Sequence, residues 1–103
     1  MQNETQQSGS MTNQPGVTDN TTLHQFELVE DGHMALARYR RQANVVAVYH
    51  VEADPALRGK GTASRLMDGI VGIARAQSLS IQPTCAYAKD WFSKHPQAAD
   101  VLS

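Results

Sequence analysis

The stretch DPALRGKGTASRLM, residues 54–67, joins a predicted strand to a predicted helix. Pro55 restricts Asp54 to an extended backbone and cannot donate to a strand ladder, so we expect the strand to end here. Gly59 and Gly61 carry no side chains, which lets a ligand approach the backbone amides closely. The first amides of a helix lack internal partners and carry partial positive charge. The stretch is therefore suited to binding phosphate.

The spacing of these glycines excludes two well-known phosphate motifs. A Walker A loop needs Ser or Thr directly after Gly-Lys, whereas Gly61 follows Lys60 here, and the upstream glycine is missing. The dinucleotide fingerprint needs a third glycine where this chain has Ser64. A diphosphate carried by something other than a P-loop nucleotide or NAD is the better candidate.

Length and charge indicate one small two-layer domain, because the chain has 103 residues and a net charge of −1. Positive side chains nevertheless outnumber negative ones in the middle of the chain. They are Arg38, Arg40, Arg41, Arg58, Lys60 and Arg65, against Glu52 and Asp54. This balance favours a local anionic ligand and argues against nucleic acid and membrane as partners.

The chemistry of the remaining residue types narrows the class further. Cys85 is the only cysteine, so an intramolecular disulfide and a cysteine-rich metal site are excluded, and the histidines show no ligand spacing. We therefore predict no metal. No signal segment and no membrane-length apolar run is found, which predicts a cytoplasmic protein. The oligomeric state stays open.

The first residues differ in composition from the rest of the chain. Residues 1–20 are rich in Gln, Asn, Ser and Thr, and we expect them to form a disordered tail before a domain over residues 21–103. Two alternating runs, 23–30 and 33–40, flank Asp31-Gly32, a pair typical of a two-residue hairpin turn. These runs predict two antiparallel strands.

The pattern changes after the hairpin. Residues 44–52 form a more continuous apolar run, which predicts a central strand covered on both faces. Apolar residues then recur at helical spacing as far as Gln77. Residues 79–85 predict a further strand, at an edge or a bulge because of Pro83, and short helices follow over 89–95 and 97–102. The order β-β-β-α-β-α predicts an α/β (α+β) fold, with one main helix on a mixed sheet whose last two strands are parallel.

Four motifs in order resemble one superfamily. The segment Arg58 to Ala63 is similar to the R/Q-x-x-G-x-G/A pyrophosphate loop of the Gcn5-related N-acetyltransferases. The segments His50-Val51-Glu52, Pro55 to Gly61, Pro83-Thr84-Cys85 and His95-Pro96 resemble its small YjdJ-type subgroup. The resemblance covers roughly residues 23 to 102.

This resemblance implies acetyl-CoA, or coenzyme A, as the cofactor. It implies that amides near Lys60 to Ala63 hold the pyrophosphate and that the strand end near Tyr49 to Glu52 holds the pantetheine arm. The same strand amides would stabilise an oxyanion. The implied cofactor-binding residues are Tyr49, His50, Val51, Arg58, Gly59, Lys60, Gly61, Thr62, Ala63, Ser64 and Arg65. The implied activity is N-acetylation of an amine on a small molecule or a protein.

Three residues are candidates for catalysis. The Cys85 thiol could accept the acetyl group or contact the CoA sulfur, and its alternative role is that of a small buried apolar residue. His50 and Glu52 lie two apart on a strand and so face the same side, where either could relay a proton from the amine. Their alternative roles are a hydrogen bond within the sheet for His50 and a cap or an ion pair for Glu52.

Other residues have weaker functional interpretations. Tyr87 could protonate the departing thiolate, although a packing role is the alternative. His95 before Pro96 indicates a helix end, with a CoA contact as the alternative. We interpret the end of this strand, with Arg38, Arg40 and Arg41, as solvated, and the alternative is that these arginines contact the 3′-phosphate of CoA.

Two functions compete with acetyl transfer. The chain could bind CoA without turnover and act with a partner, because it lacks the extra helices that form a substrate wall in larger relatives of that superfamily. It could also bind nucleic acid through the basic segment, but few aromatic residues accompany the arginines.

Overall fold

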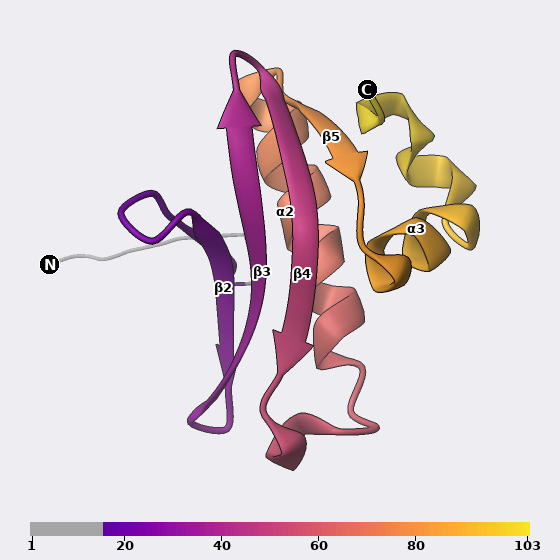
Figure 1. The fold of residues 1–103 in the computed structure, drawn as a ribbon. Coiled ribbons are helices and arrows are strands. Elements are labelled where there is room, and N and C mark those ends of the chain that lie inside the picture. The colour runs from indigo at the N-terminus through magenta and orange to yellow at the C-terminus, as the bar shows by residue number, and fades with distance from the viewer. Residues whose placement is uncertain (1–15) are drawn as a thin grey trace, which may run out of the picture.

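The computed structural model describes residues 16–103, which form a five-stranded sheet with one long helix behind it (Figure 1). The strands are β1 (Thr18–Asn20), β2 (Gln25–Glu30), β3 (His33–Gln42), β4 (Val45–Ala53) and β5 (Ser80–Pro83). The α-helices are α2 (Thr62–Gln77) and α3 (Ala86–Ser93), and the 3₁₀ helices are η2 (Pro55–Leu57) and η3 (Pro96–Val101).

The strands lie side by side in chain order, β1-β2-β3-β4-β5. All neighbours are antiparallel except β4 and β5, which are parallel because α2 connects them. The predicted α/β fold with a mixed sheet and one main helix is confirmed. The predicted element order is also confirmed for everything after β1, a strand that was not predicted.

Two tight turns set the register of the sheet. Asp31 and Gly32 both have positive φ, 52° and 77°, as a two-residue hairpin turn of the predicted type requires. The turn between β3 and β4 is equally tight, since Gln42 pairs with Val45, and Ala43 has a φ of 55°. Consequently the long strands β3 and β4 form a ladder, with one register shift between Arg38 and Tyr39, that fixes which side chains share a face.

The core lies between α2 and one face of the sheet. Val46 and Val48 of β4 are buried, whereas Val45, Ala47 and Tyr49 are partly or largely exposed. The prediction that this strand is central and covered on both faces is therefore wrong. β3 is the middle strand, and β4 alternates because helix α2 covers only one face of the sheet (Figure 1).

The domain begins earlier than predicted. Val17 is buried, and β1 pairs with β2 within the segment assigned to the tail of residues 1–20. A Cβ on Gly69 of α2 would overlap the Val17 side chain, so glycine at this position makes room for Val17. The tail prediction is thus wrong for residues 17–20, and residues 1–15 lie outside the described part of the chain.

The segment after α2 differs from prediction in its boundaries. β5 covers only Ser80–Pro83 instead of residues 79–85, and it is the edge strand that Pro83 indicated. α3 begins at Ala86 instead of residue 89, so Cys85 is the N-cap of a helix and does not lie on a strand. The last predicted helix is a 3₁₀ helix, which starts at Pro96. Within residues 16–103, no helix is long and apolar enough to cross a membrane.

Candidate functional site

Strand β4 separates from β5 part-way along its length. β5 pairs only with Val45 to Val48, and the Val48 carbonyl accepts hydrogen bonds from both the amide and the hydroxyl of Thr84, at 2.9 and 3.0 Å. On the other side, Arg38 pairs with His50 and Tyr39 with Val48, so Tyr49 is an extra, bulged residue. We call the point formed by Val48 and Thr84 the vertex.

Beyond the vertex, one edge of β4 is free for a ligand. Within residues 16–103, residues 49–53 of β4 have no strand partner on the β5 side. An unpaired strand edge offers backbone donors and acceptors to an extended molecule that contains amide groups. Figure 1 shows β4 running on past the end of β5 toward the loop before α2.

That loop presents a second set of backbone donors. Gly59 and Gly61 have φ of 76° and 77°, and Gly61 is the N-cap of α2 without any side-chain capping bond. The first hydrogen bond of this helix runs from the Arg65 amide to the Gly61 carbonyl, at 3.0 Å. The amides of the preceding first turn, residues 62–64, therefore have no helical partner. This geometry fits the phosphate site predicted from the glycine spacing.

The charged side chains around this loop are largely engaged by the β2–β3 hairpin. The Arg65 guanidinium makes two hydrogen bonds to the Glu30 carboxylate, at 2.7 and 2.8 Å, and the buried Thr62 hydroxyl donates to it at 2.6 Å. Lys60 lies 3.6 Å from Asp31. The bonds from Arg65 and Thr62 lower the pKa of Glu30 to about 2. The side chains of Thr62 and Arg65 thus hold the hairpin, and the loop presents mainly its amides to a ligand.

His50 and Glu52 form a hydrogen-bonded pair. His50 Nε2 lies 2.7 Å from Glu52 Oε1, and about half of each side chain is exposed. Their cross-strand partners are Arg38 and Leu36, on the sheet face opposite α2. The prediction that both residues face the same side is confirmed, and the carboxylate is positioned to orient the imidazole.

Cys85 lies next to the vertex. It follows Thr84, its Sγ accepts a hydrogen bond from the Ala88 amide at 3.5 Å, and it packs at the edge of the core. Tyr87 stands in the first turn of α3, where burial and then the carboxylates of Asp90 and Asp68 raise its pKa. Within residues 16–103, no hydrogen bond links Cys85 to His50 or Glu52, which face the open side of the sheet.

α3 is fastened to the start of α2. Trp91 Nε1 donates to the Ser64 hydroxyl at 2.9 Å, and Phe92 packs edge-on against Trp91. The His95 ring stacks on Trp91 with centroids 4.0 Å apart, and its Nδ1 lies 2.7 Å from the Trp91 carbonyl oxygen. These contacts explain His95 as a packing residue. They also hold the first turn of α2 against α3, the helix whose N-cap is Cys85.

Two participants were not predicted. Glu30 organises the loop, yet nothing in the sequence around it signals a partner 35 positions away. Thr84 closes the vertex, and the only signal was its place between Pro83 and Cys85. Within residues 16–103, no group of three or more His, Cys, Asp or Glu side chains could hold a metal ion.

Comparison with known proteins agrees with this arrangement. The sequence model of the family described as GCN5-related N-acetyl-transferase matches residues 25–101. The fold is similar to the NMR solution structure of a GCN5-like protein from Staphylococcus aureus, with a TM-score of 0.67 and 23% sequence identity. That match covers 88% of this chain and 90% of the other. No curated protein matches the sequence.

Proposed function

The chain belongs to the GCN5-related N-acetyltransferase family, and we propose that it transfers an acetyl group from acetyl-CoA to an amine. The observation that carries the proposal is that two neighbouring stretches of backbone have hydrogen-bonding groups without a partner. One is the uncapped first turn of α2, and the other is the edge of β4 beyond Val48. The first suits a diphosphate and the second suits an amide-containing arm. The YjdJ-type subgroup stays a prediction.

Acetyl-CoA would lie along this path. The Lys60 amide already donates to the Leu57 carbonyl at 3.2 Å, so the amides of residues 61–64 would hold its pyrophosphate, with the exposed Arg58 beside them. The β4 edge over residues 49–52 would hold the pantetheine arm, which brings the thioester to the vertex. The bound cofactor supplies an acyl group activated for attack by an amine. Backbone amides of β4 near the bulge would stabilise negative charge on the carbonyl oxygen.

The His50–Glu52 pair is suited to accept the proton of the amine. Glu52 orients the imidazole of His50, and a positioned base of this kind raises the rate of proton transfer. When bound, acetyl-CoA would supply an acetyl group whose carbon–sulfur bond is replaced by a bond to the amine nitrogen. His50 would take up the proton that the nitrogen loses, and Tyr87 or water would supply a proton to the departing sulfur. The Cys85 thiol adjoins the vertex, where it would contact the sulfur or accept the acetyl group.

A titration with acetyl-CoA tests the cofactor site. Adding it to ¹⁵N-labelled protein should first shift the amide resonances of residues 58–65 and then those of residues 49–52. Alanine at Gly61 should weaken these shifts, because its φ of 77° is strained for any side chain and a Cβ would lie 3.2 Å from Arg65 Nη1. Unchanged resonances of residues 58–65 at millimolar acetyl-CoA would refute the proposal.

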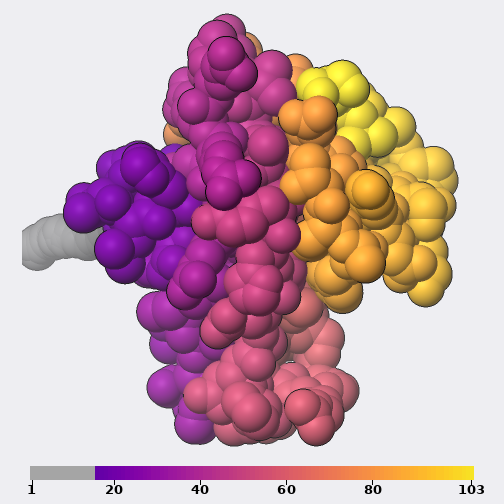
Figure 2. Space-filling model, viewed as in Figure 1, coloured from indigo at the N-terminus to yellow at the C-terminus, as the bar shows by residue number. Residues whose placement is uncertain are grey.

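A second candidate is CoA binding without turnover, in concert with a partner. It is favoured by the open face of the sheet, which no element within residues 16–103 covers in front of β3 and β4 (Figure 2). Release of free thiol from acetyl-CoA with a panel of amines separates the two candidates. The cytoplasmic location and the absence of nucleic-acid and membrane partners stay predictions from the sequence.

A further inference from the structure

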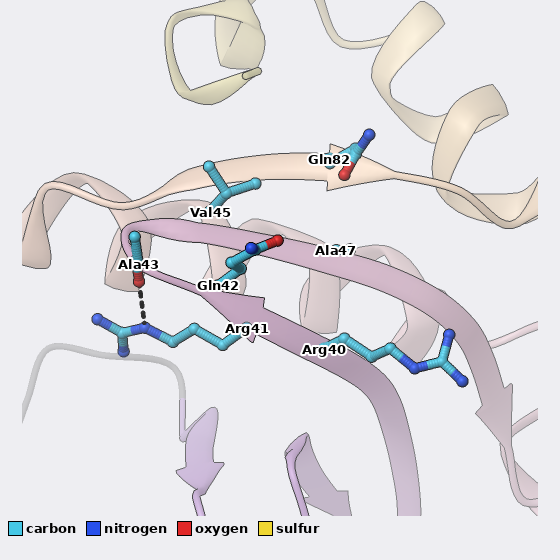
Figure 3. Close-up of a pocket in the computed structure, with 7 residues that line it drawn as sticks. All are labelled: Arg40, Arg41, Gln42, Ala43, Val45, Ala47 and Gln82. Atoms are coloured by element: carbon cyan, nitrogen blue, oxygen red, sulfur yellow. Dashed lines mark hydrogen bonds between the residues drawn. The ribbon is translucent and has the colours of Figure 1, made fainter.

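A depression lies on the open face of the sheet, on the other side of the vertex from the loop. Its volume is about 750 Å³, and it is formed by the β3–β4 hairpin and the outer side of β5 (Figure 3). The lining residues are Arg40, Arg41, Gln42, Ala43, Val45, Ala47 and Gln82.

The register of the sheet explains the shape of this depression. Arg40 pairs with Ala47, and Ala47 pairs with Gln82, so the three residues form one row across β3, β4 and β5. The small side chain of Ala47 forms the floor between two long polar ones. The alternation of β5 directs Gln82 outward, because the preceding Ile81 is buried.

The depression carries positive charge that no carboxylate neutralises. No Asp or Glu lines it, and within residues 16–103 neither Arg40 nor Arg41 forms an ion pair. Arg41 is bonded through Nε to the Ala43 carbonyl at 2.9 Å. Arg40 extends the other way along the strand in Figure 3, and its guanidinium carbon lies 4.6 Å from the centre of the Tyr49 ring. Arg40 is thus held over the bulge with its hydrogen-bond donors available.

The depression adjoins the point where the acyl group would lie. The Ala47–Gln82 pair immediately precedes the last pair of the β4–β5 ladder. The His50–Glu52 pair stands on the same face, on the other side of Tyr49. Because Tyr49 is a bulged residue, Ala47 and His50 pair with Arg40 and Arg38, which are only two residues apart on β3, so Ala47 and His50 are about 7 Å apart. A cationic group and an anionic group therefore face each other across the vertex, at a separation that one small molecule can span.

We propose that the acceptor is a small amine that also carries a carboxylate. Arg40 holds the carboxylate, and Glu52 attracts the ammonium group toward His50. A planar guanidinium binds the two oxygens of a carboxylate well, and stacking on Tyr49 keeps it in place. This inference rests on the proposed function, because it takes the acetyl-CoA site for granted.

A binding experiment without acetyl-CoA tests the acceptor site separately from the cofactor site. ¹⁵N-labelled protein is titrated with γ-aminobutyrate and with n-butylamine, which lacks the carboxylate. We expect γ-aminobutyrate to shift the amide of Ala47 and the side-chain Nε–H of Arg40 saturably, and n-butylamine to leave both unchanged. Arg40→Gln should weaken γ-aminobutyrate binding at least about tenfold. Lys89→Gln removes an exposed charge on α3 and is the matched control.

Turnover provides the second measurement. Arg40→Gln should raise the KM for γ-aminobutyrate at least about tenfold and leave thiol release with n-butylamine unchanged. Equal shifts from both amines, or γ-aminobutyrate binding that survives Arg40→Gln, would overturn the acceptor site. If acetyl-CoA does not shift the resonances of residues 58–65 while γ-aminobutyrate still shifts that of Ala47, the cofactor proposal is wrong and the carboxylate site is supported.

Discussion

Glu30 at the end of β2 and Arg65 in the first turn of α2 form a two-point hydrogen-bonded ion pair, with distances of 2.7 and 2.8 Å. Arg65 also donates to the Lys60 carbonyl at 2.7 Å, so this ion pair fixes the path of the loop. The β2–β3 hairpin therefore shapes the candidate phosphate site without belonging to it.

Glu30→Gln should lower stability at neutral pH. The pKa of Glu30 lies below its ordinary value of 4.5, at about 2, so its contribution is complete above pH 4.5 and is lost as the pH falls toward 2. The difference in urea midpoint between wild type and variant should shrink over this interval. Asp68→Asn, which removes an exposed carboxylate from α2, is the control. A difference that is independent of pH would contradict this assignment.

Gly69→Ala should destabilise the fold. The added methyl group would overlap Val17, and overpacking of this kind costs about 1–3 kcal/mol. The overlap involves both the Cβ and the Cγ2 of Val17, so Val17→Gly should relieve it, and the double variant should be more stable than the sum of the single changes predicts. Chemical denaturation of all four proteins measures the coupling. Strictly additive effects would show that Val17 does not pack on α2.

Ser78→Gly should stabilise the protein by about 1 kcal/mol. Ser78 ends α2 in the left-handed conformation, with φ of 57° and ψ of 42°, which costs energy for a residue with a side chain. Gln77→Gly, one position earlier inside the helix, should have the opposite effect. Thermal unfolding of both variants checks the signs.

Cys85→Ser separates the structural role of this residue from its chemical role. The Sγ caps the Ala88 amide, and a serine hydroxyl is a better cap, so the variant should keep or raise its stability by up to about 1 kcal/mol. If the thiol accepts the acetyl group, intact-mass measurement after incubation with acetyl-CoA should show an adduct on the wild type alone. Cys85→Ala loses both the cap and the thiol. Full acetyl transfer by Cys85→Ser would exclude a covalent role.

Glu52→Gln should slow acetyl transfer without weakening acetyl-CoA binding. The carboxylate lies 2.7 Å from His50, on the sheet face opposite the one that α2 covers. We expect kcat to fall about tenfold to hundredfold, with the KM for acetyl-CoA unchanged. Glu27→Gln on β2 is the control. An equal loss in both variants would point to a general effect of charge.

Local sequence patterns predicted much of the fold and part of the candidate site. The glycine spacing at Gly59 and Gly61, the helical repeat up to Gln77 and the Asp31-Gly32 turn depend on neighbours in sequence, and the structure contains each as expected. The same spacing predicted the helix start that we propose as the phosphate site. That His50 and Glu52 share a face also follows from a two-residue interval, since alternate strand residues face the same side, whereas their hydrogen bond is seen only in the structure.

Only the tertiary structure decided the features that join distant segments. Glu30 reaches Arg65, Trp91 reaches Ser64, and Thr84 closes the ladder at Val48, and none of these contacts leaves a local signature in the sequence. The apolar run of β4 could not reveal which of its faces a helix would cover, because burial depends on elements that fold around it. For the same physical reason, Arg40, Ala47 and Gln82 form a site only once the register of three strands is set.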